Sequence, residues 1–359
     1  MSRPHPANTA ARHAISESLK AAGIAPGTRL LVAVSGGSDS LALAMAVLFA
    51  GPRNGYPVAS ITVDHGLRAE SAAEASRVRS FLEAHGADPA IVRRVEVNPS
   101  AGGPEAAARD QRYAAIAQVA RELGAIVLTG HTADDQAETV LLGLARGSGA
   151  RSIRGMAPAT SLPGAPDILL LRPFLSIRRA ELRAGLDDMG IRWEEDPTNG
   201  PESQWRAADG SLLRRVAIRH MAIPALERAI GGGAVDALAR TAALLAADDD
   251  ALETWAADAF EEMGGRLDIK ALRGLPRAVR TRILRRAALR SGVRGGELMR
   301  WHIDHLDDLV MGPGGGRGIN LPGVRAVQRG GKIMLERVGL TVSDGSAQSA
   351  NQGKDSNES

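Results

Sequence analysis

The fold of this chain is decided by the segment Arg29-Leu30-Leu31-Val32-Ala33-Val34-Ser35-Gly36-Gly37-Ser38-Asp39-Ser40. Its apolar first half ends in two glycines, which can adopt backbone angles closed to other residues, and the apolar run 41–49 that follows has the character of a helix. The amides of such a loop and of the first helical turn have no intrahelical partner, and the helix dipole is positive at that end. The segment therefore predicts a strand, a phosphate-binding loop and a helix that hold a pyrophosphate group.

The residues of this loop exclude two common nucleotide-binding motifs. A Walker loop ends in Gly-Lys-Ser or Gly-Lys-Thr, and a dinucleotide-binding loop reads Gly-x-Gly-x-x-Gly. Here an acid, Asp39, stands beside the anion instead of a lysine, which suits a magnesium-bound pyrophosphate that is released whole. We therefore take Asp39 as the candidate Mg²⁺ ligand; the alternative is an ordinary turn in which Asp39 only caps the helix.

The hexapeptide formed by Ser35, Gly36, Gly37, Ser38, Asp39 and Ser40 resembles the phosphate loop of the N-type ATP pyrophosphatases, the PP-loop family. The resemblance implies that these six residues bind ATP, that ATP is split between its α and β phosphates, and that a substrate is adenylated. It leaves the identity of the acceptor open.

Length and composition limit the possibilities further. A chain of 359 residues exceeds the usual size of one domain, and its 44% of apolar residues can supply more than one core. The absence of cysteine excludes disulfides, thiolate zinc sites and any mechanism through a protein thiol. No window approaches about 18 uninterrupted apolar residues, so we expect a cytoplasmic protein that has no membrane segment.

The order of apolar and helical segments predicts an α/β fold. Strands are expected at 29–34, 58–63, 90–97, 125–129 and 168–171, with helical segments between them. This alternation is typical of a doubly wound, five-stranded parallel sheet, in which ligands bind at the carboxyl ends of the strands.

Two groups of polar residues follow strands and so become site candidates. His65 and Arg68 come after the second strand, where a nucleoside is usually bound, although a solvated turn would read the same way. On the helix that begins near 104, Glu105, Arg109 and Arg112 share one face, so the glutamate can orient an arginine that grips a phosphate or carboxylate. An ordinary surface ion pair is the alternative.

A second chemical segment, Gly130 to Thr139, follows the fourth strand directly. It brings His131, Asp134, Asp135 and Glu138 within about two helical turns at the carboxyl edge of the sheet. Acids also stabilise helix starts through the dipole, but that role explains one acid better than the whole set.

Beyond the phosphate loop, an ordered series of motifs resembles the tRNA(Ile)-lysidine synthases. The motifs are Val63 to Arg68, Glu105 through Arg109 to Tyr113, Gly130 to Thr139, Arg146 to Gly149, Leu171 to Leu175, Glu195 to Asn199, and Ile218-Arg219. The sequence departs from the family pattern in a longer connection at 200–211, in Val216 in place of an asparagine, and in Thr132 in place of a histidine.

This resemblance implies a C–N ligase that adenylates the C2 oxygen of the wobble cytidine of tRNA(Ile), after which the ε-amine of free L-lysine displaces AMP. ATP and Mg²⁺ are the implied cofactors. The implied roles are ATP binding for Ser35 to Ser40 and catalysis for Asp39, Asp135 and Arg112. From their places in the predicted fold we add His65 as a candidate for ATP binding, and Arg109, His131, Asp134 and Glu138 as candidates for binding of lysine or substrate. A free ammonium has a pKa near ~10.4, so acids could hold it before it loses a proton.

The remainder of the chain predicts a tRNA-contacting region. We expect an ATP-binding domain at 1–199, a mobile loop at 200–213, a mainly helical region at 214–340 with a small hairpin at 321–335, and a disordered tail at 341–359. Between Arg266 and Arg300, eleven Arg and Lys stand against two acids. Arg282 and Arg286 on one helical face, together with Arg146, are the candidate tRNA contacts, and a solvated helix is the alternative.

Three other functions compete with this interpretation. A tRNA 2-thiolation enzyme of the same family that forms a protein persulfide would need cysteine, which is absent. Ammonia-using relatives share the loop but do not require the basic segment. A non-catalytic nucleotide- or RNA-binding protein would release no pyrophosphate with any acceptor.

Overall fold

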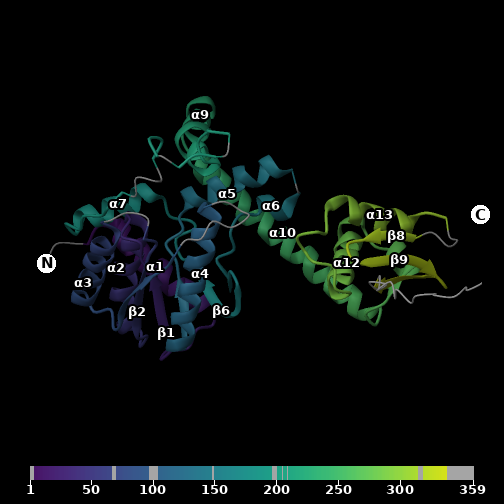
Figure 1. Cartoon of the computed structure of the whole chain (residues 1–359), viewed down its shortest axis with the longest axis horizontal. Coiled ribbons are helices and arrows are strands. Elements are labelled where there is room, and N and C mark those ends of the chain that lie inside the picture. Colours follow the sequence, from purple (N-terminus) through teal and green to yellow (C-terminus); the bar gives the residue numbers. More distant parts are fainter. Residues whose placement is uncertain are drawn as a thin grey trace, which may run out of the picture. The chain divides into compact units, whose positions relative to one another are not determined.

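The computed structural model describes residues 4–66, 70–96, 104–147, 149–195, 200–203, 205–207, 209–313 and 318–337, with side chains from residue 106 onward in the third range. Internal contacts divide the chain into two compact units, Met1–Asp249 and Asp250–Ser359 (Figure 1). The division falls inside the long helix α10 (Ala234–Glu262), well after the boundary expected near 199.

Unit 1 contains a six-stranded sheet in the order β3-β2-β1-β4-β6-β5. Its strands are β1 (Arg29–Ala33), β2 (Val58–Asp64), β3 (Ala90–Arg94), β4 (Ala125–Leu128), β5 (Ala159–Leu162) and β6 (Ala165–Leu171). Parallel pairs join β1 to β2, β1 to β4, β2 to β3, and β4 to β6. The five expected parallel strands are therefore confirmed.

The sixth strand, β5, is an addition to the expected fold. It pairs antiparallel with β6 across the short turn that contains Gly164. The sequence does not reveal it, because Ala159-Thr160-Ser161-Leu162 is short and only Leu162 of the four is buried, so its apolar signal is weak. Antiparallel edge strands on parallel sheets of this kind are common.

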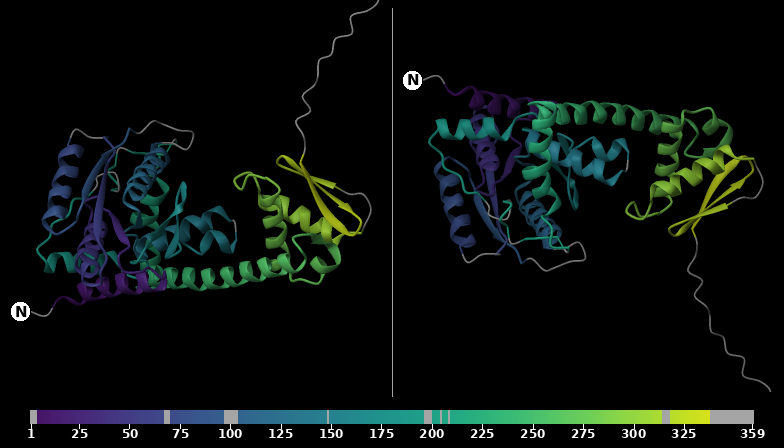
Figure 2. Two further views of the ribbon diagram at one scale, coloured as in Figure 1. Left: turned by 90° about the horizontal axis from the view of Figure 1, so that it is seen from below. Right: turned by 90° about the horizontal axis from the view of Figure 1, so that it is seen from above.

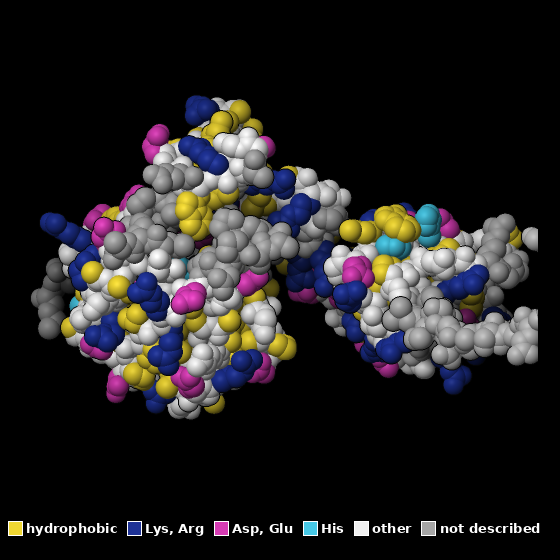
Figure 3. Space-filling view, in the orientation of Figure 1, with side chains coloured by type: hydrophobic (Ala, Val, Ile, Leu, Met, Phe, Trp, Pro, Cys, Tyr) yellow, Lys and Arg dark blue, Asp and Glu magenta, His cyan; other side chains and the backbone are white. Residues whose placement is uncertain are grey.

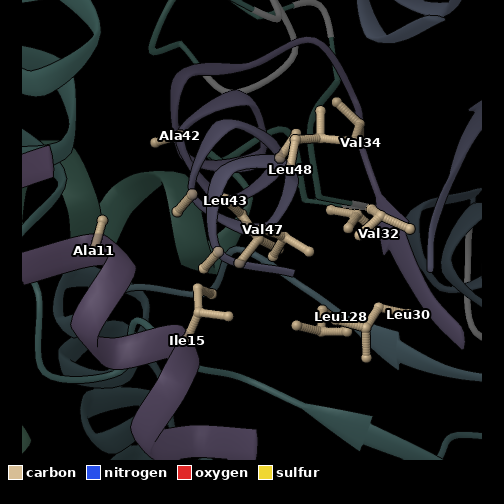
Figure 4. Close-up of a cluster of buried hydrophobic side chains, with 14 of the residues drawn as sticks. Ala11, Ile15, Leu30, Val32, Val34, Ala42, Leu43, Val47, Leu48 and Leu128 are labelled. Carbon is tan, nitrogen blue, oxygen red and sulfur yellow. The ribbon is translucent and has the colours of Figure 1, made fainter. Parts of the chain in front are cut away.

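Helices cover both faces of the sheet, because successive residues of each strand point to opposite sides. On one face, Leu30 and Val32 of β1 pack against α1 (Pro6–Ala21) and α2 (Ser38–Arg53); Ile15, Leu43 and Val47 converge there (Figure 4). The helices α3 (Ser71–Ala84) and α7 (Arg179–Asp188) join this core. On the other face, Leu31 packs with α4 (Pro104–Leu123).

The strand order places the site. Because β1 lies between β2 and β4, the chain turns in opposite directions after β1 and after β4. In doubly wound sheets the ligand-binding crevice lies at the carboxyl ends of such a pair of strands, and we use that name for this region. The helix that follows β1 is α2, and the helix that follows β4 is α5 (Ala133–Arg146). The segment between β4 and α5 approaches the first turn of α2 so closely that a Cβ atom on Gly130 would lie 2.6 Å from the Asp39 carbonyl oxygen. Glycine is therefore required at the end of β4.

Three helical segments complete unit 1 beyond the sheet. They are α6 (Ala150–Ile153), α8 (Arg214–Ala217), which continues through a π-helical turn at Ile218–Ala222, and α9 (Ile223–Ile230). Val216, the departure from the family pattern, is buried in α8. In the expected loop at 200–213, Arg206 and Leu212 form an isolated antiparallel bridge, while residues 204 and 208 lie outside the described ranges.

Unit 2 has a core of its own around Phe260, Leu272, Ile283 and Leu306. Besides the end of α10 it contains α11 (Ile269–Arg273), α12 (Arg277–Arg290), α13 (Arg300–Met311), and the strands β7 (Leu267–Asp268), β8 (Gly318–Leu321), β9 (Val324–Arg329) and β10 (Lys332–Arg337). The strands form an antiparallel sheet in the order β7-β10-β9-β8, which packs on α13 (Figure 2). The predicted hairpin is confirmed as β9 and β10, and the tail expected at 341–359 lies outside the described residues.

Across the described ranges, no one helix has both the length and the apolar character needed to cross a membrane, and the bent pair of 214–230 with α10 meets that test by length and composition alone.

Candidate active site

Hydrogen bonds of its own serines fix the conformation of the phosphate loop. The Ser35 amide donates to Ser40 Oγ at 3.1 Å, and Ser40 Oγ donates to the Gly37 carbonyl at 2.9 Å, while Gly36 adopts a φ of +89°. Gly37 is the N-cap of α2, and among the described residues no side chain caps that helix. Backbone amides of the first turn are therefore left for an anion, as the sequence predicted for this segment.

Asp39 lies in the first turn of α2 and faces an arginine from α7. Its Oδ2 accepts a hydrogen bond from Arg179 Nε at 2.7 Å, and its Oδ1 accepts one from Ser38 Oγ at 3.1 Å. Burial raises the pKa of Asp39; Arg179 opposes this shift, and Asp135 adds to it. Asp39 is therefore more than a helix cap, because its carboxylate takes part in a charged contact across the crevice.

Asp135 is fixed at the start of α5 by a capping box with Thr132. The Thr132 amide and hydroxyl both donate to Asp135 Oδ2 at 2.9 Å. Its Oδ1 accepts from Arg179 at 3.1 Å and from Arg219 at 3.4 Å. Burial alone would raise the pKa of Asp135, but Arg179, His131 and the Thr132 amide outweigh it and lower that pKa. The threonine that replaces a family histidine thus has a structural role.

The other two acids of this segment are also paired with arginines. Asp134 Oδ2 accepts from the Arg179 backbone amide at 2.8 Å, and Arg178 Nε lies 3.4 Å from the same oxygen. Glu138, whose side chain is 1% exposed, accepts from Arg219 Nε at 2.6 Å and from Arg215 Nε at 2.8 Å. A lysine ammonium bound here would have to share a carboxylate with a guanidinium.

These arginines are the site residues that the sequence alone did not single out. Arg179 comes 140 residues after its partner Asp39, and Arg219 comes 81 residues after Glu138. Helical spacing reveals pairs three or four residues apart, but not pairs made by folding. One of these arginines, Arg219, could have been found from the Ile218-Arg219 motif, but that motif is known only through the family resemblance.

His131 lies at the end of β4 among positive charges. Its Nδ1 is 2.9 Å from Thr129 Oγ1. Burial lowers the pKa of His131 to about 4, with Arg172, Arg215 and Arg112 adding to the effect. The imidazole is therefore neutral at pH 7 and can exchange hydrogen bonds without carrying charge.

The arginines of α4 reach the same region. The guanidinium carbons of Arg109 and Arg112 each lie 5.5 Å from the centre of the Tyr113 ring, with Arg109 exposed and Arg112 half-buried. Burial lowers the pKa of Arg112. The expected contact of Glu105 with Arg109 lies outside the described side chains. His65 is half-buried at the carboxyl end of β2, next to β1 in the sheet, and Arg68 lies outside the described residues.

The candidate tRNA contacts are less free than the sequence indicated. Arg146 is exposed at the end of α5. Arg282 Nε lies 3.5 Å and Arg286 Nη2 lies 3.8 Å from the carboxylate of Glu253 in α10. Further ion pairs join arginines of 266–300 to acids outside that segment: Arg277 with Asp304 and Asp307, Arg280 with Asp307, Arg290 with Glu261, and Arg300 with Asp304.

Part of the charge excess of the basic segment is therefore balanced by four acids that precede or follow it in sequence, namely Glu253, Glu261, Asp304 and Asp307. On the face seen in Figure 3, Lys and Arg side chains are interspersed with Asp and Glu rather than gathered into one patch. Arg294 has the most exposed side chain among the ion-paired arginines of the segment, at 83%.

Comparison with known proteins agrees with this geometry. The family model of the PP-loop domain matches residues 8–226, which include the whole crevice, and the model of the TilS substrate binding domain matches residues 267–333. The chain thus has the fold and phosphate loop of a PP-loop ATPase. A solved structure, the U34-tRNA thiolase NcsA from Methanococcus maripaludis with its [4Fe-4S] cluster, shares this fold with a TM-score of 0.52 and 15% identity, over 66% of this chain and 78% of that one.

Closer relatives identify the family. The chain is 46% identical over 323 residues to the tRNA(Ile)-lysidine synthase of Streptomyces coelicolor, which covers 89% of this chain and 88% of that protein. It is 45% identical over 334 residues to the tRNA(Ile)-lysidine synthase of Thermobifida fusca, over 92% and 97% of the two chains. This chain belongs to the tRNA(Ile)-lysidine synthase family.

Proposed function

We propose that this chain uses ATP to adenylate the C2 oxygen of the wobble cytidine of tRNA(Ile), with release of pyrophosphate, and that the ε-amine of free L-lysine then attacks C2 and displaces AMP. The observation that carries the proposal is the meeting of Asp39 from the phosphate loop and Asp135 from the second chemical segment on one guanidinium, that of Arg179. ATP cleavage and amine attack need neighbouring sites, and these two segments supply them within unit 1.

For the first step, the loop amides would hold the β and γ phosphates, and the dipole of α2 would stabilise the leaving pyrophosphate. The carboxylate of Asp39, with that of Asp135 beside it, is a hard oxygen donor set that fits Mg²⁺, which usually binds through one or two carboxylates and substrate phosphates. When bound there, Mg²⁺ would neutralise charge on the phosphates. Arg183, whose Nε donates to Ser38 Oγ at 3.2 Å, adds a cation to the same loop.

For the second step, the lysine ammonium must lose a proton before its nitrogen can attack. Cations close to His131 help to lower the pKa of that ring. An ammonium bound beside Arg112 and Arg215 would experience the same repulsion, which favours its neutral form. We therefore infer that the arginines around His131 favour the neutral form of the lysine amine. Asp134, Asp135 and Glu138 would orient the amine and these arginines.

The proposed function is tested with ATP, labelled L-lysine and tRNA(Ile) that carries the CAU anticodon. We expect lysine to enter the tRNA with AMP and pyrophosphate as products, and we expect no incorporation when the wobble cytidine is replaced by uridine. Incubation with ammonium or with a sulfide donor in place of lysine tests the other family activities. Product with either donor, and none with lysine, would contradict the proposal.

Binding of tRNA by unit 2 is the part of the proposal that the TilS substrate binding domain match supports. Arg294→Glu combined with Arg300→Glu changes two exposed arginines of that unit. Each arginine–phosphate interaction that the variant removes should reduce the log–log salt slope of tRNA binding by about one unit. Filter binding at several salt concentrations measures the slope, and Lys20→Glu, a charge reversal at an exposed residue of α1, is the control for a charge change outside unit 2.

An unchanged affinity and slope in the double variant would place tRNA recognition on other residues. Arg282→Glu with Arg286→Glu is a poorer probe, because both new acids would face Glu253 and destabilise the packing of α12 on α10.

A further inference from the structure

Arg179, the first residue of α7, lies at the centre of three carboxylates. Its Nε donates to Asp39 Oδ2 at 2.7 Å, its Nη2 donates to Asp135 Oδ1 at 3.1 Å, and its backbone amide donates to Asp134 Oδ2 at 2.8 Å. Its side chain is 16% exposed. Arg179 is the single described residue that hydrogen-bonds to the acids of both chemical segments of the crevice.

The position of the guanidinium is that of a cation shared by two acids. Asp39 and Asp135 have side chains that are 19% and 12% exposed, so their mutual repulsion is only weakly screened by water. The Arg179 guanidinium, which pairs with both carboxylates, offsets part of this repulsion. Arginine suits the task because its planar fork reaches two carboxylates at once.

The same guanidinium conflicts with a metal ion on Asp39. A Mg²⁺ ion would bind a carboxylate oxygen at about 2.0–2.1 Å. If Nε of Arg179 stayed on that oxygen, two cations would lie side by side in a poorly solvated crevice, which is unfavourable. Binding of a metal to Asp39 Oδ2 therefore requires Arg179 Nε to leave that oxygen.

The phosphate loop lies on the side of α7 from which the Arg179 guanidinium extends. Arg179 and Arg183 are four residues apart and thus share one face of α7, and Arg183 already reaches the phosphate loop through Ser38 Oγ. A guanidinium released from Asp39 on this face is close to where the phosphates of ATP would lie. It can pair with their oxygens in the bidentate manner that arginine favours.

We propose that Arg179 is a positioning residue that takes the place of the metal: it holds Asp39 and Asp135 together in the nucleotide-free protein and transfers to the pyrophosphate group when Mg²⁺ binds Asp39. This inference rests on the proposed function for the identity of the nucleotide. It assigns to the start of α7 a role that couples metal binding to nucleotide binding.

The neighbouring Arg178 provides a matched control. It is also an arginine at the start of α7 and also pairs with Asp134, but its other acidic partner is Asp236 of α10, at 3.4 Å. Arg178→Gln therefore removes the same charge, one residue away, without removing the hydrogen bonds to Asp39 and Asp135.

The test is a titration of the nucleotide-free protein with Mn²⁺, a paramagnetic substitute for Mg²⁺, followed by electron paramagnetic resonance. Arg179→Gln should bind Mn²⁺ at least about 10-fold more tightly than the unaltered protein, because no guanidinium competes for Asp39. Arg178→Gln should bind it as the unaltered protein does. With ATP present, Arg179→Gln should bind the Mn²⁺–ATP complex more weakly than the unaltered protein, because a cation that would pair with the phosphates is missing.

Mn²⁺ affinity that is unchanged or weaker in Arg179→Gln would overturn the proposal, as would an equal gain in Arg178→Gln. If Arg179→Gln fails to fold, the same titration of Arg179→Lys decides the matter. A single ammonium cannot reproduce the fork, so Mn²⁺ binding should still tighten, and unchanged binding would overturn the proposal. Because the titration uses neither lysine nor tRNA, its outcome is distinguishable from failure of the lysine-joining activity.

Discussion

Asp39→Asn is expected to lower the rate of pyrophosphate release from ATP by about 1000-fold or more while leaving the fold intact. The substitution keeps the volume of the side chain but removes the carboxylate charge that would hold Mg²⁺ at the phosphate loop. It also weakens one of the two hydrogen bonds of the Arg179 guanidinium with acids, although Asp135 keeps the other. The rate is measured as pyrophosphate formed in the presence of tRNA(Ile) and lysine.

Asp167→Asn is the control for this prediction, because Asp167 is an exposed aspartate of β6 that pairs with Arg121 on the surface of the same unit. Exposed ion pairs contribute only about 0–1 kcal/mol, so this variant should keep both its stability and its activity. Thermal unfolding of the two variants separates loss of chemistry from loss of structure. Full activity of Asp39→Asn would contradict the role of Asp39 as the Mg²⁺ ligand and leave it only a structural role at the start of α2.

The parts of the fold that the sequence predicted are those determined by neighbours along the chain. The apolar run of Leu30, Leu31 and Val32, the two glycines of the loop and the apolar start of α2 are local signals, and all of them define the strand, loop and helix found in the structure. The carboxyl ends of β1 and β4 then had to lie at the same edge once the sheet was parallel, and the observed strand order makes them neighbours. The position of both chemical segments followed from that topology.

The features that the sequence could not predict depend on contacts between distant residues. Arg179 and Arg219 carry no local mark that separates them from surface arginines, and their roles appear only when folding brings acids to them. The ion pairs of the basic segment at 266–300 could not be predicted for the same reason, because Glu253 and Asp307 lie outside the counted residues, and its contact with tRNA stays a prediction. A charge count along the chain measures composition, whereas the field at a surface depends on the folded arrangement.

Glu138→Gln is expected to have the second large effect, because one buried carboxylate joins two arginines to α5. The Glu138 side chain is 1% exposed, while Arg215 and Arg219, its partners from 214–222, are 30% and 26% exposed. Removing one partner of a buried ion pair leaves the other charges uncompensated and typically costs about 3–5 kcal/mol. Since these arginines are partly solvated, we expect a loss of about 2–4 kcal/mol in the free energy of unfolding of unit 1.

Glu122→Gln is the matched control, since Glu122 of α4 forms an exposed ion pair with Arg93 of β3. Urea unfolding followed by circular dichroism should show a change below about 1 kcal/mol for this variant. In Glu138→Gln, hydrogen exchange should accelerate first in the amides of 214–222, because ion pairs no longer tie that segment to α5. Lysine transfer should fall with it, because Arg215 and Arg219 would no longer be held beside His131 and Asp135. Equal behaviour of the two glutamine variants would show that Glu138 does not hold 214–222 on α5.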